Sequence, residues 1–458
     1  MAGGTADNQP TDGSAALDPG ALIRSRDYRR LLVFAAVIGV VVSAACWAFL
    51  ESIHAIQQLV FDDLPDALGF ESAPWWWPLP VLAIAGALIA FAIDRLPGTG
   101  GHEPAEGLKV GGPPTTPIQL PGVILAALAS IALGLVLGPE APLIALGAGL
   151  TLMVVGLMKK DVPDLATVVR VAASSFAALA TIFGSPIVGA IIIIEAAGLA
   201  GPTLPLVLLP GLIAAGIGSL VFIGVGSMTG LSTQAYAMAP LHLPTYAQPS
   251  VGDLLWTIVL GAAAAGLTFA IVMGGRKVEG LVKRRRFALT VLAAIAIAGI
   301  AIAFAEITGQ SAEAVLFSGQ EAMGPVVAQA STLSLGTLAL LLLCKGVAWA
   351  ISLGSARGGP TFPAIFLGVV GGLLASHLPG FAETPAVAVL VGAAVVSVLR
   401  LPLSAIVIAL LVSQGGAGVA PLVIVGVAAA YIVVLTLDAR PGRGDVTPGR
   451  SDPATTPS

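Results

Sequence analysis

The chain has 458 residues and a formal net charge of −4; 57% of its residues are hydrophobic and only 10% are charged. Soluble domains carry about 25% charged residues, so this composition excludes an ordinary soluble protein. Apolar runs that reach or approach the roughly twenty residues needed to cross a bilayer lie at 31–50, 81–93, 123–137, 254–273 and 335–351. The sequence therefore predicts an all-α polytopic membrane protein.

Polar segments divide the chain. Residues 1–27 and 438–458 are polar, and their composition predicts a disordered tail at each end. A mixed polar loop at 224–250 separates a first membrane unit, 28–223, from a second one, 251–437. No further soluble domain is expected within these boundaries.

Basic residues cluster at 24–30, 276–286 and 440–443. The positive-inside rule places all three clusters on the cytoplasmic side of the cell membrane. Both tails are then expected to be cytoplasmic and the 224–250 loop extracytoplasmic. A nucleic-acid partner is disfavoured for the basic run at 283–286, because this run lies beside two long apolar segments.

The first motif follows the apolar run that ends near residue 96. Gly98-Thr99-Gly100-Gly101 is expected to open a short helical segment at 105–110. Thr is a good helix N-cap, and glycine lets the backbone approach a ligand closely. Taken alone, the same residues also suit an ordinary turn between helices.

The second motif is Gly138-Pro139-Glu140-Ala141-Pro142, which ends one apolar run and begins another. Proline is accepted in the first turn of a helix, and the first N–H groups of that helix have no internal partner and attract anions. Glu140 is the one ionisable residue between 110 and 158. An acid inside a membrane segment is a functional candidate by default; the alternative is a carboxylate that caps its own helix.

The motif occurs twice. Residues 138–147 and 359–368 both read G-P-x-x-P-x-I-x-L-G, and residues 186–191 and 402–407 form a second, similar pair. Interrupted helices at matching positions of two halves point to an ion site near the middle of the membrane. Thr361 stands in the second copy where the first has Glu140, so the helix start does not need an acid to form.

The remaining apolar runs are uneven in length. Those at 184–196 and 401–412 are too short to span a bilayer, which favours tilted and re-entrant helices over a bundle of straight ones. Glu195 ends one of these runs and lies either in the membrane or at its interface. Lys345 lies in another run and either snorkels to the cytoplasmic edge or lends positive potential to an anion path.

Other chemistry is disfavoured. The four histidines are scattered and form no metal-binding set, and neither a phosphate-binding loop nor a pair of catalytic carboxylates is evident. We therefore expect no enzyme activity, no metal and no cofactor.

Four segments, 98–102, 138–142, 184–195 and 359–363, resemble in order the helix starts of the CLC chloride channel and transporter family. The resemblance covers about residues 28–437. It implies two inverted-topology repeats and a homodimer in the lipid bilayer, with a pore for chloride or a similar small anion in each subunit. It also implies a gating role for Glu140. The anion-binding residues it implies are Thr99, Gly100, Gly138, Pro139, Ala141, Thr361 and Phe362.

Departures from the family pattern bear on mechanism. Pro139 replaces the basic residue beside the gating glutamate, and Ala196 stands where the family's exchangers commonly have a proton-transfer glutamate. A tyrosine that coordinates the anion in the family has no counterpart at the matching position. Ala196 favours channel-like conduction, whereas the missing tyrosine and the altered motifs leave room for a different substrate class. The alternatives are proton-coupled exchange with Glu195 as a candidate proton path, another anion such as fluoride or nitrate, and a different substrate class.

Overall fold

The computed structural model describes residues 23–108, 112–158, 164–201, 203–229 and 237–439. Most of these residues form helices, and the described part contains no strand beyond one isolated bridge between two residues. The all-α prediction is therefore confirmed. Most of the tails predicted at 1–27 and 438–458 lies outside the described residues.

The first half of the chain supplies one set of elements. These are α2 (Arg26–Gln58), the π-helical η1 (Leu59–Asp63), α3 (Leu64–Ala67), α4 (Pro78–Arg95), the 3-10 turns η2 (Pro104–Glu106) and η3 (Pro117–Gln119), α5 (Leu120–Ile131), α6 (Glu140–Leu157), α7 (Asp164–Phe183), α8 (Pro186–Ala196) and α9 (Thr203–Thr229). Helix α9 continues past residue 223, so the predicted 224–250 loop begins inside a helix.

The second half supplies a similar set. It consists of α11 (Val251–Val282), α12 (Arg286–Thr308), the 3-10 turn η4 (Ala312–Ala314), α13 (Met323–Ala328), α14 (Leu335–Ser355), α15 (Thr361–Ala375), α16 (Glu383–Leu399), α17 (Pro402–Ser413) and α18 (Val419–Asp438). Side chains fix several of these boundaries. At α11, for example, Ser250 and Asp253 form a reciprocal capping box.

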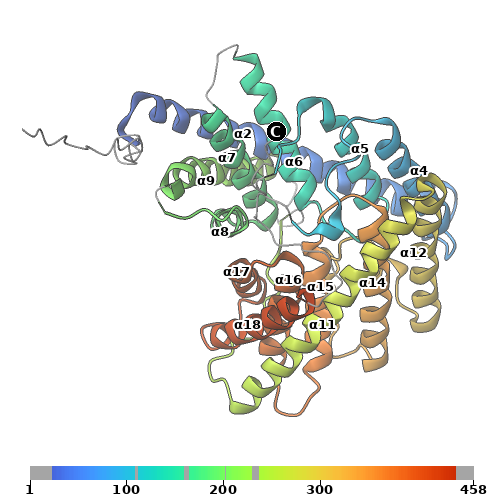
Figure 1. Ribbon diagram of the computed structural model, residues 1–458. Helices are drawn as coiled ribbons and strands as arrows, with labels where there is room; N and C mark the ends of the chain where they lie inside the picture. Colours follow the sequence, from blue (N-terminus) through green and yellow to red (C-terminus); the bar gives the residue numbers. More distant parts are fainter. Residues whose placement is uncertain (1–22, 109–111, 159–163, 202, 230–236, 440–458) are drawn as a thin grey trace, which may run out of the picture.

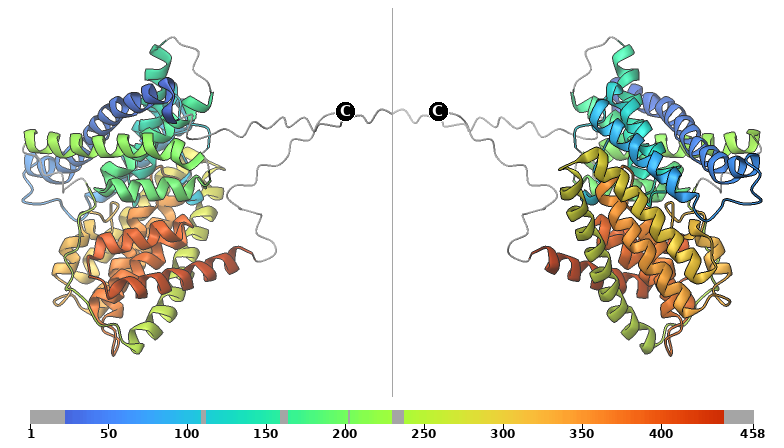
Figure 2. Two further views of the ribbon diagram at one scale, coloured as in Figure 1. Left: turned by 90° about the vertical axis from the view of Figure 1, so that its left-hand side faces the viewer. Right: turned by 90° about the vertical axis from the view of Figure 1, so that its right-hand side faces the viewer.

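Helix lengths are uneven, as the apolar runs predicted. Nine helical segments of the described chain are long and apolar enough to cross a membrane, while α8, α15, α16 and α17 are shorter. Figure 1 shows the first half above the second, and Figure 2 shows the same two layers from either side. Helices α4 and α12, which come from different halves, pack against each other.

Helices α15 and α16 form the centre of the second half, and nearly all of their residues are buried. A helix that is apolar on all sides belongs in such an interior. The two helices approach closely at Gly368 and Gly372, where any side chain would collide with the backbone of α16 at Val391 and Val387. Small residues of this kind are what allow helices in lipid to pack tightly.

Candidate functional site

The two copies of the repeated motif meet in space. The N–H of Gly138 donates to the carbonyl of Gly359 over 2.7 Å, and the N–H of Gly359 donates to the carbonyl of Gly138 over 2.6 Å. Helices α6 and α15 each begin two residues later, at Glu140 and Thr361. The unpaired N–H groups of two helix starts, from the two halves of the chain, are thereby brought to one place.

The Glu140 carboxylate lies at this meeting point and is completely buried. Its Oε1 atom accepts a hydrogen bond from the N–H of Thr361 over 2.5 Å. Glu140 and Thr361 occupy the same position in the two copies of the motif. The acid of one copy therefore occupies the start of the other copy's helix, where partial positive charge favours an anion.

Two buried polar atoms of the site lack a hydrogen-bond partner. Within the described residues, Glu140 Oε2 and the buried hydroxyl of Thr361 have no hydrogen-bond partner. Leaving buried polar atoms unpaired costs free energy, so such atoms are suited to a bound ion, a proton or water. Glycine is required beside them, because a Cβ atom at Gly138 or Gly359 would overlap the Glu140 carboxyl group.

Most of the predicted anion-binding residues gather here. Gly138, Pro139 and Ala141 belong to the first helix start, and Thr361 and Phe362 open the second. The ring of Phe362 is completely buried and stacks on Phe183 of α7, with centroids 5.7 Å apart. This stacking fixes one wall of the site.

Thr99 and Gly100 are placed differently from the expectation. Residues 98–101 form a turn in which every φ is positive, at 85°, 50°, 73° and 97°. No α-helix follows; the chain continues into the 3-10 turn Pro104–Glu106, and residues 109–111 lie outside the described part. Of the predicted segment at 105–110, residues 105–106 belong to this 3-10 turn, residues 107–108 are not helical, and the rest lies outside the described residues. Thr99 is exposed.

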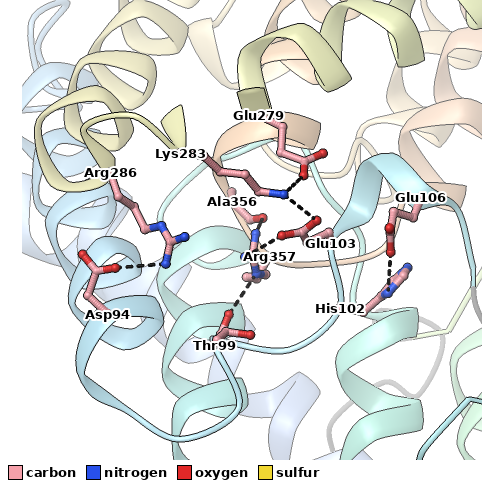
Figure 3. A network of polar contacts seen from close by, with 10 residues as sticks. All are labelled: Asp94, Thr99, His102, Glu103, Glu106, Glu279, Lys283, Arg286, Ala356 and Arg357. Carbon is pink, nitrogen blue, oxygen red and sulfur yellow. Dashed lines mark hydrogen bonds and ion pairs between the residues drawn. The ribbon is translucent and has the colours of Figure 1, made fainter. Parts of the chain in front are cut away.

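Arg357 joins this turn to the second helix start. The residue is 8% exposed, its Nε donates to the carbonyl of Thr99 over 3.2 Å, and its Nη1 donates to that of Ala356 over 3.0 Å. Arg357 stands only two residues before Gly359. The guanidinium therefore ties the 98–101 turn to the segment that leads into α15, and Figure 3 shows its contacts with Thr99 and Ala356.

Three more charged residues extend the contacts of Arg357. We call Glu103, Glu279, Lys283 and Arg357 together the basal network. Arg357 Nη2 lies 3.8 Å from Glu103 Oε1, and Lys283 Nζ donates to both Glu103, over 3.2 Å, and Glu279. Partial burial opposes ionisation of Glu103, but hydrogen bonds with Glu279 and Lys283 and the charge of Arg357 lower its pKa overall. The hydrogen bond with Glu279 raises the pKa of Lys283. Sequence patterns gave no sign of this network.

Glu195 is held at a second contact between the halves. Its Oε1 accepts from the N–H of Leu403 over 2.9 Å, and its Oε2 accepts from the N–H and the hydroxyl of Ser404 over 2.7 and 2.6 Å. The carboxylate thus caps the start of α17 from the end of α8. These two helices carry the second pair of similar segments.

A cavity of about 720 Å³ reaches the first helix start. We call it the access cavity; its wall includes Pro139, the end of α2 and residues 310–322. Three acids line it, Asp62, Glu313 and Glu321. Burial and the charges of Asp62 and Glu321 raise the pKa of Glu313. The sequence did not reveal this cavity, because its walls come from segments far apart in the chain.

Sequence relatives point to ion transport. The chain is 27% identical over 360 residues to the protein YfeO of Escherichia coli O139:H28, whose name assigns it provisionally to ion transport. The aligned region covers 78% of this chain and 81% of YfeO. YfeO of Shigella flexneri serotype 5b matches with the same identity and coverage.

Solved structures share the fold. A slow cyanobacterial Cl−/H+ antiporter aligns with a TM-score of 0.73 and 20% identity, covering 90% of this chain and 96% of that one. A CLC-type fluoride/proton antiporter aligns with a TM-score of 0.67 and 17% identity, covering 89% and 95%. The model of the family described as voltage gated chloride channel matches residues 83–434. This match spans most of the chain, and the chain therefore belongs to the voltage gated chloride channel family.

Proposed function

We propose that this protein transports chloride or a similar small anion through a path gated by Glu140. The observation that carries the proposal is the hydrogen bond from the N–H of Thr361 to the Glu140 carboxylate. A carboxylate and a halide compete for the same donors at a helix start. The side chain therefore occupies the position that a transported anion would take.

The proposed mechanism uses partial charges. Helix-start N–H groups at 138–142 and 359–363 bind the anion weakly enough to release it. As a carboxylate, Glu140 excludes the anion from this position. When it is protonated, or displaced by an anion, it leaves the start of α15 and the path opens.

We favour channel-like conduction over proton-coupled exchange. Ala196 cannot transfer a proton, and the Glu195 carboxylate is already engaged as the cap of α17. Two observations favour the exchanger as the second candidate. Both structural relatives described above are antiporters, and the basal network contains two carboxylates, those of Glu103 and Glu279. Chloride is the first candidate anion, and fluoride is the second.

We further propose that each subunit of a homodimer contains its own pore in the cell membrane. The basic clusters place both termini and the basal network on the cytoplasmic side. The access cavity then opens to the outside. Cysteine labelling of residues in 237–250 from outside intact cells would test this orientation.

Flux measurements in liposomes test the function. Purified protein is reconstituted in chloride-loaded vesicles, a chloride gradient is imposed, and chloride efflux and internal pH are recorded together, with Glu140→Gln in parallel. Chloride efflux without proton movement is the result we expect. Coupled proton uptake that disappears in the variant would establish the exchanger. Failure of both proteins to move chloride or fluoride would contradict the proposal.

A further inference from the structure

Lys345 places a buried amino group in the protein with no acidic partner among the described residues. Its side chain, on α14, is completely buried. Nζ donates to the carbonyls of Ala314 and Leu316 over 3.0 and 2.8 Å and lies 4.3 Å from the centre of the Phe366 ring. No carboxylate of the described chain lies within ion-pair distance. Snorkelling to the cytoplasmic edge, one of the two sequence-based interpretations, is therefore wrong.

A lysine in this position is costly. Burying a charge without an opposite charge is unfavourable, and ionisable residues at membrane depth usually serve a pathway. A leucine or methionine would fill the same space at lower cost. Two carbonyl dipoles and the face of a ring repay part of the cost and hold the ammonium in one place.

The contacts of Lys345 place it between the access cavity and the gate. Ala314 and Leu316, whose carbonyls it binds, line the access cavity together with Pro139. Phe366, whose ring it faces, lies on α15, the helix whose first N–H holds Glu140. The ammonium therefore stands behind the cavity wall, beside the helix that forms the site.

The other fixed charges of the cavity would oppose an anion. Asp62, Glu313 and Glu321 line it, and Pro139 supplies no charge beside the gate. The one other ionisable group in the wall is His54, which lies 3.7 Å from Glu321. An anion that approaches through this cavity needs a compensating positive potential.

We propose that Lys345 supplies this potential and so determines the affinity of the site for anions. It acts from behind the wall and does not touch the ion, since direct contact with a full positive charge would slow release. The inference rests on the proposed function, because it assigns the anion to the helix starts at Gly138 and Thr361.

Chloride binding to purified full-length protein tests the inference. Calorimetric titration is carried out with Glu140→Gln, in which the competing carboxylate is removed. Lys345→Gln is then added; its amide can still donate to the two carbonyls but lacks the charge. A unit charge on the order of 10 Å from an ion changes binding by roughly tenfold at an effective dielectric constant of about 20. We expect Lys345→Gln to weaken chloride binding by about that factor and Lys345→Arg to weaken it less than about threefold.

A second variant moves the charge. Pro139→Arg places a cation on the cavity side of the gate and should tighten binding when Lys345 is present. It should also restore much of the affinity lost in Lys345→Gln. Because Pro139→Arg leaves Lys345 in place, its own comparison with the parent can be measured even if Lys345→Gln fails to fold.

The outcomes separate the two proposals. Equal chloride affinity in folded Lys345→Gln and its parent, or no tightening by Pro139→Arg, would overturn the role of Lys345 and leave anion transport intact. If Glu140→Gln with Lys345 present binds neither chloride nor fluoride, the proposed function itself fails, and the inference fails with it.

Discussion

The two copies of the repeated motif have the same local structure and different chemistry. Both place a glycine and a proline before a helix, and the two glycines are joined by two hydrogen bonds between their backbone N–H and carbonyl groups. One copy then presents Glu140, and the other presents the N–H that Glu140 binds. The two copies have the same backbone structure, but only one carries an acid. The Glu140 side chain can therefore occupy the anion position itself, and an anion from solution can bind there once Glu140 moves away.

The largest expected effect comes from moving the acid between the copies. Glu140→Thr removes the gate and should raise chloride flux roughly thirtyfold, because charge interactions at buried helix ends reach about 2 kcal/mol. Adding Thr361→Glu places a carboxylate at the matching position of the other copy. The double variant should return flux toward that of the wild type, measured as chloride efflux from liposomes.

The control for this exchange is Thr361→Glu alone. It puts two carboxylates into one buried site, and their repulsion should lower flux or folding yield. If the double variant conducts as much chloride as Glu140→Thr, a carboxylate at position 361 does not replace Glu140. The proposed equivalence of the two positions would then be wrong.

The next effect concerns the glycines. Gly359→Ala would bring a Cβ atom into the Glu140 carboxyl group, and crowding of this kind costs about 1–3 kcal/mol. We expect a lower thermal midpoint in detergent, partly restored by Glu140→Ala. Gly266→Ala is the matched control, since no atom lies within 4 Å of its added Cβ. A loss of stability that Glu140→Ala does not relieve would show that the glycine is needed for another reason.

Glu195 offers a sharper test of its own role. If Glu195 serves only as the cap of α17, Glu195→Ala should cost about 1–2 kcal/mol of stability and leave chloride flux per folded protein unchanged. Ser404→Ala, which removes one of the three hydrogen bonds, should cost less. Loss of proton movement at unchanged stability would instead identify Glu195 as the proton path.

The smallest effect concerns the basal network. Because the pKa of Glu103 is lowered, its contribution to stability is present above its ordinary pKa of about 4.3 and is lost as the pH falls through the lowered value. Glu103→Gln should therefore reduce stability by about 1 kcal/mol at pH 6, and the two proteins should converge once the pH falls below the lowered pKa of Glu103. Thermal unfolding at a series of pH values measures this difference. A constant difference at every pH would mean that Glu103 acts without its charge.

The sequence was a good guide to the two helix starts of the repeated motif and a poor one to their partners. Repeated glycines and prolines at 138–147 and 359–368 predicted two interrupted helices, and Glu140 in the first copy was predicted as the functional acid. The hydrogen bond from the Thr361 N–H to the Glu140 carboxylate joins residues far apart in the chain, and no local sequence pattern predicts such a contact. The predicted anion position and gate thus remain proposals supported by geometry.

Local signals also failed where tertiary contacts override them. Thr99 suggested a helix cap, yet φ is positive there and Arg357 binds its carbonyl. Lys345 suggested either an interfacial or a pathway residue, and the carbonyls of Ala314 and Leu316 together with the Phe366 ring explain how it stays inside. In both cases the deciding partner comes from a distant segment.

The central claim is that the Glu140 carboxylate occupies an anion site. The most direct measurement is the anomalous scattering of bromide in crystals of Glu140→Gln and of the wild type. We predict a bromide ion within hydrogen-bond distance of the Thr361 N–H in the variant, and weaker or no bromide there in the wild type. Bromide bound equally in both proteins, or absent from the helix starts at Gly138 and Gly359 in the variant, would contradict the account.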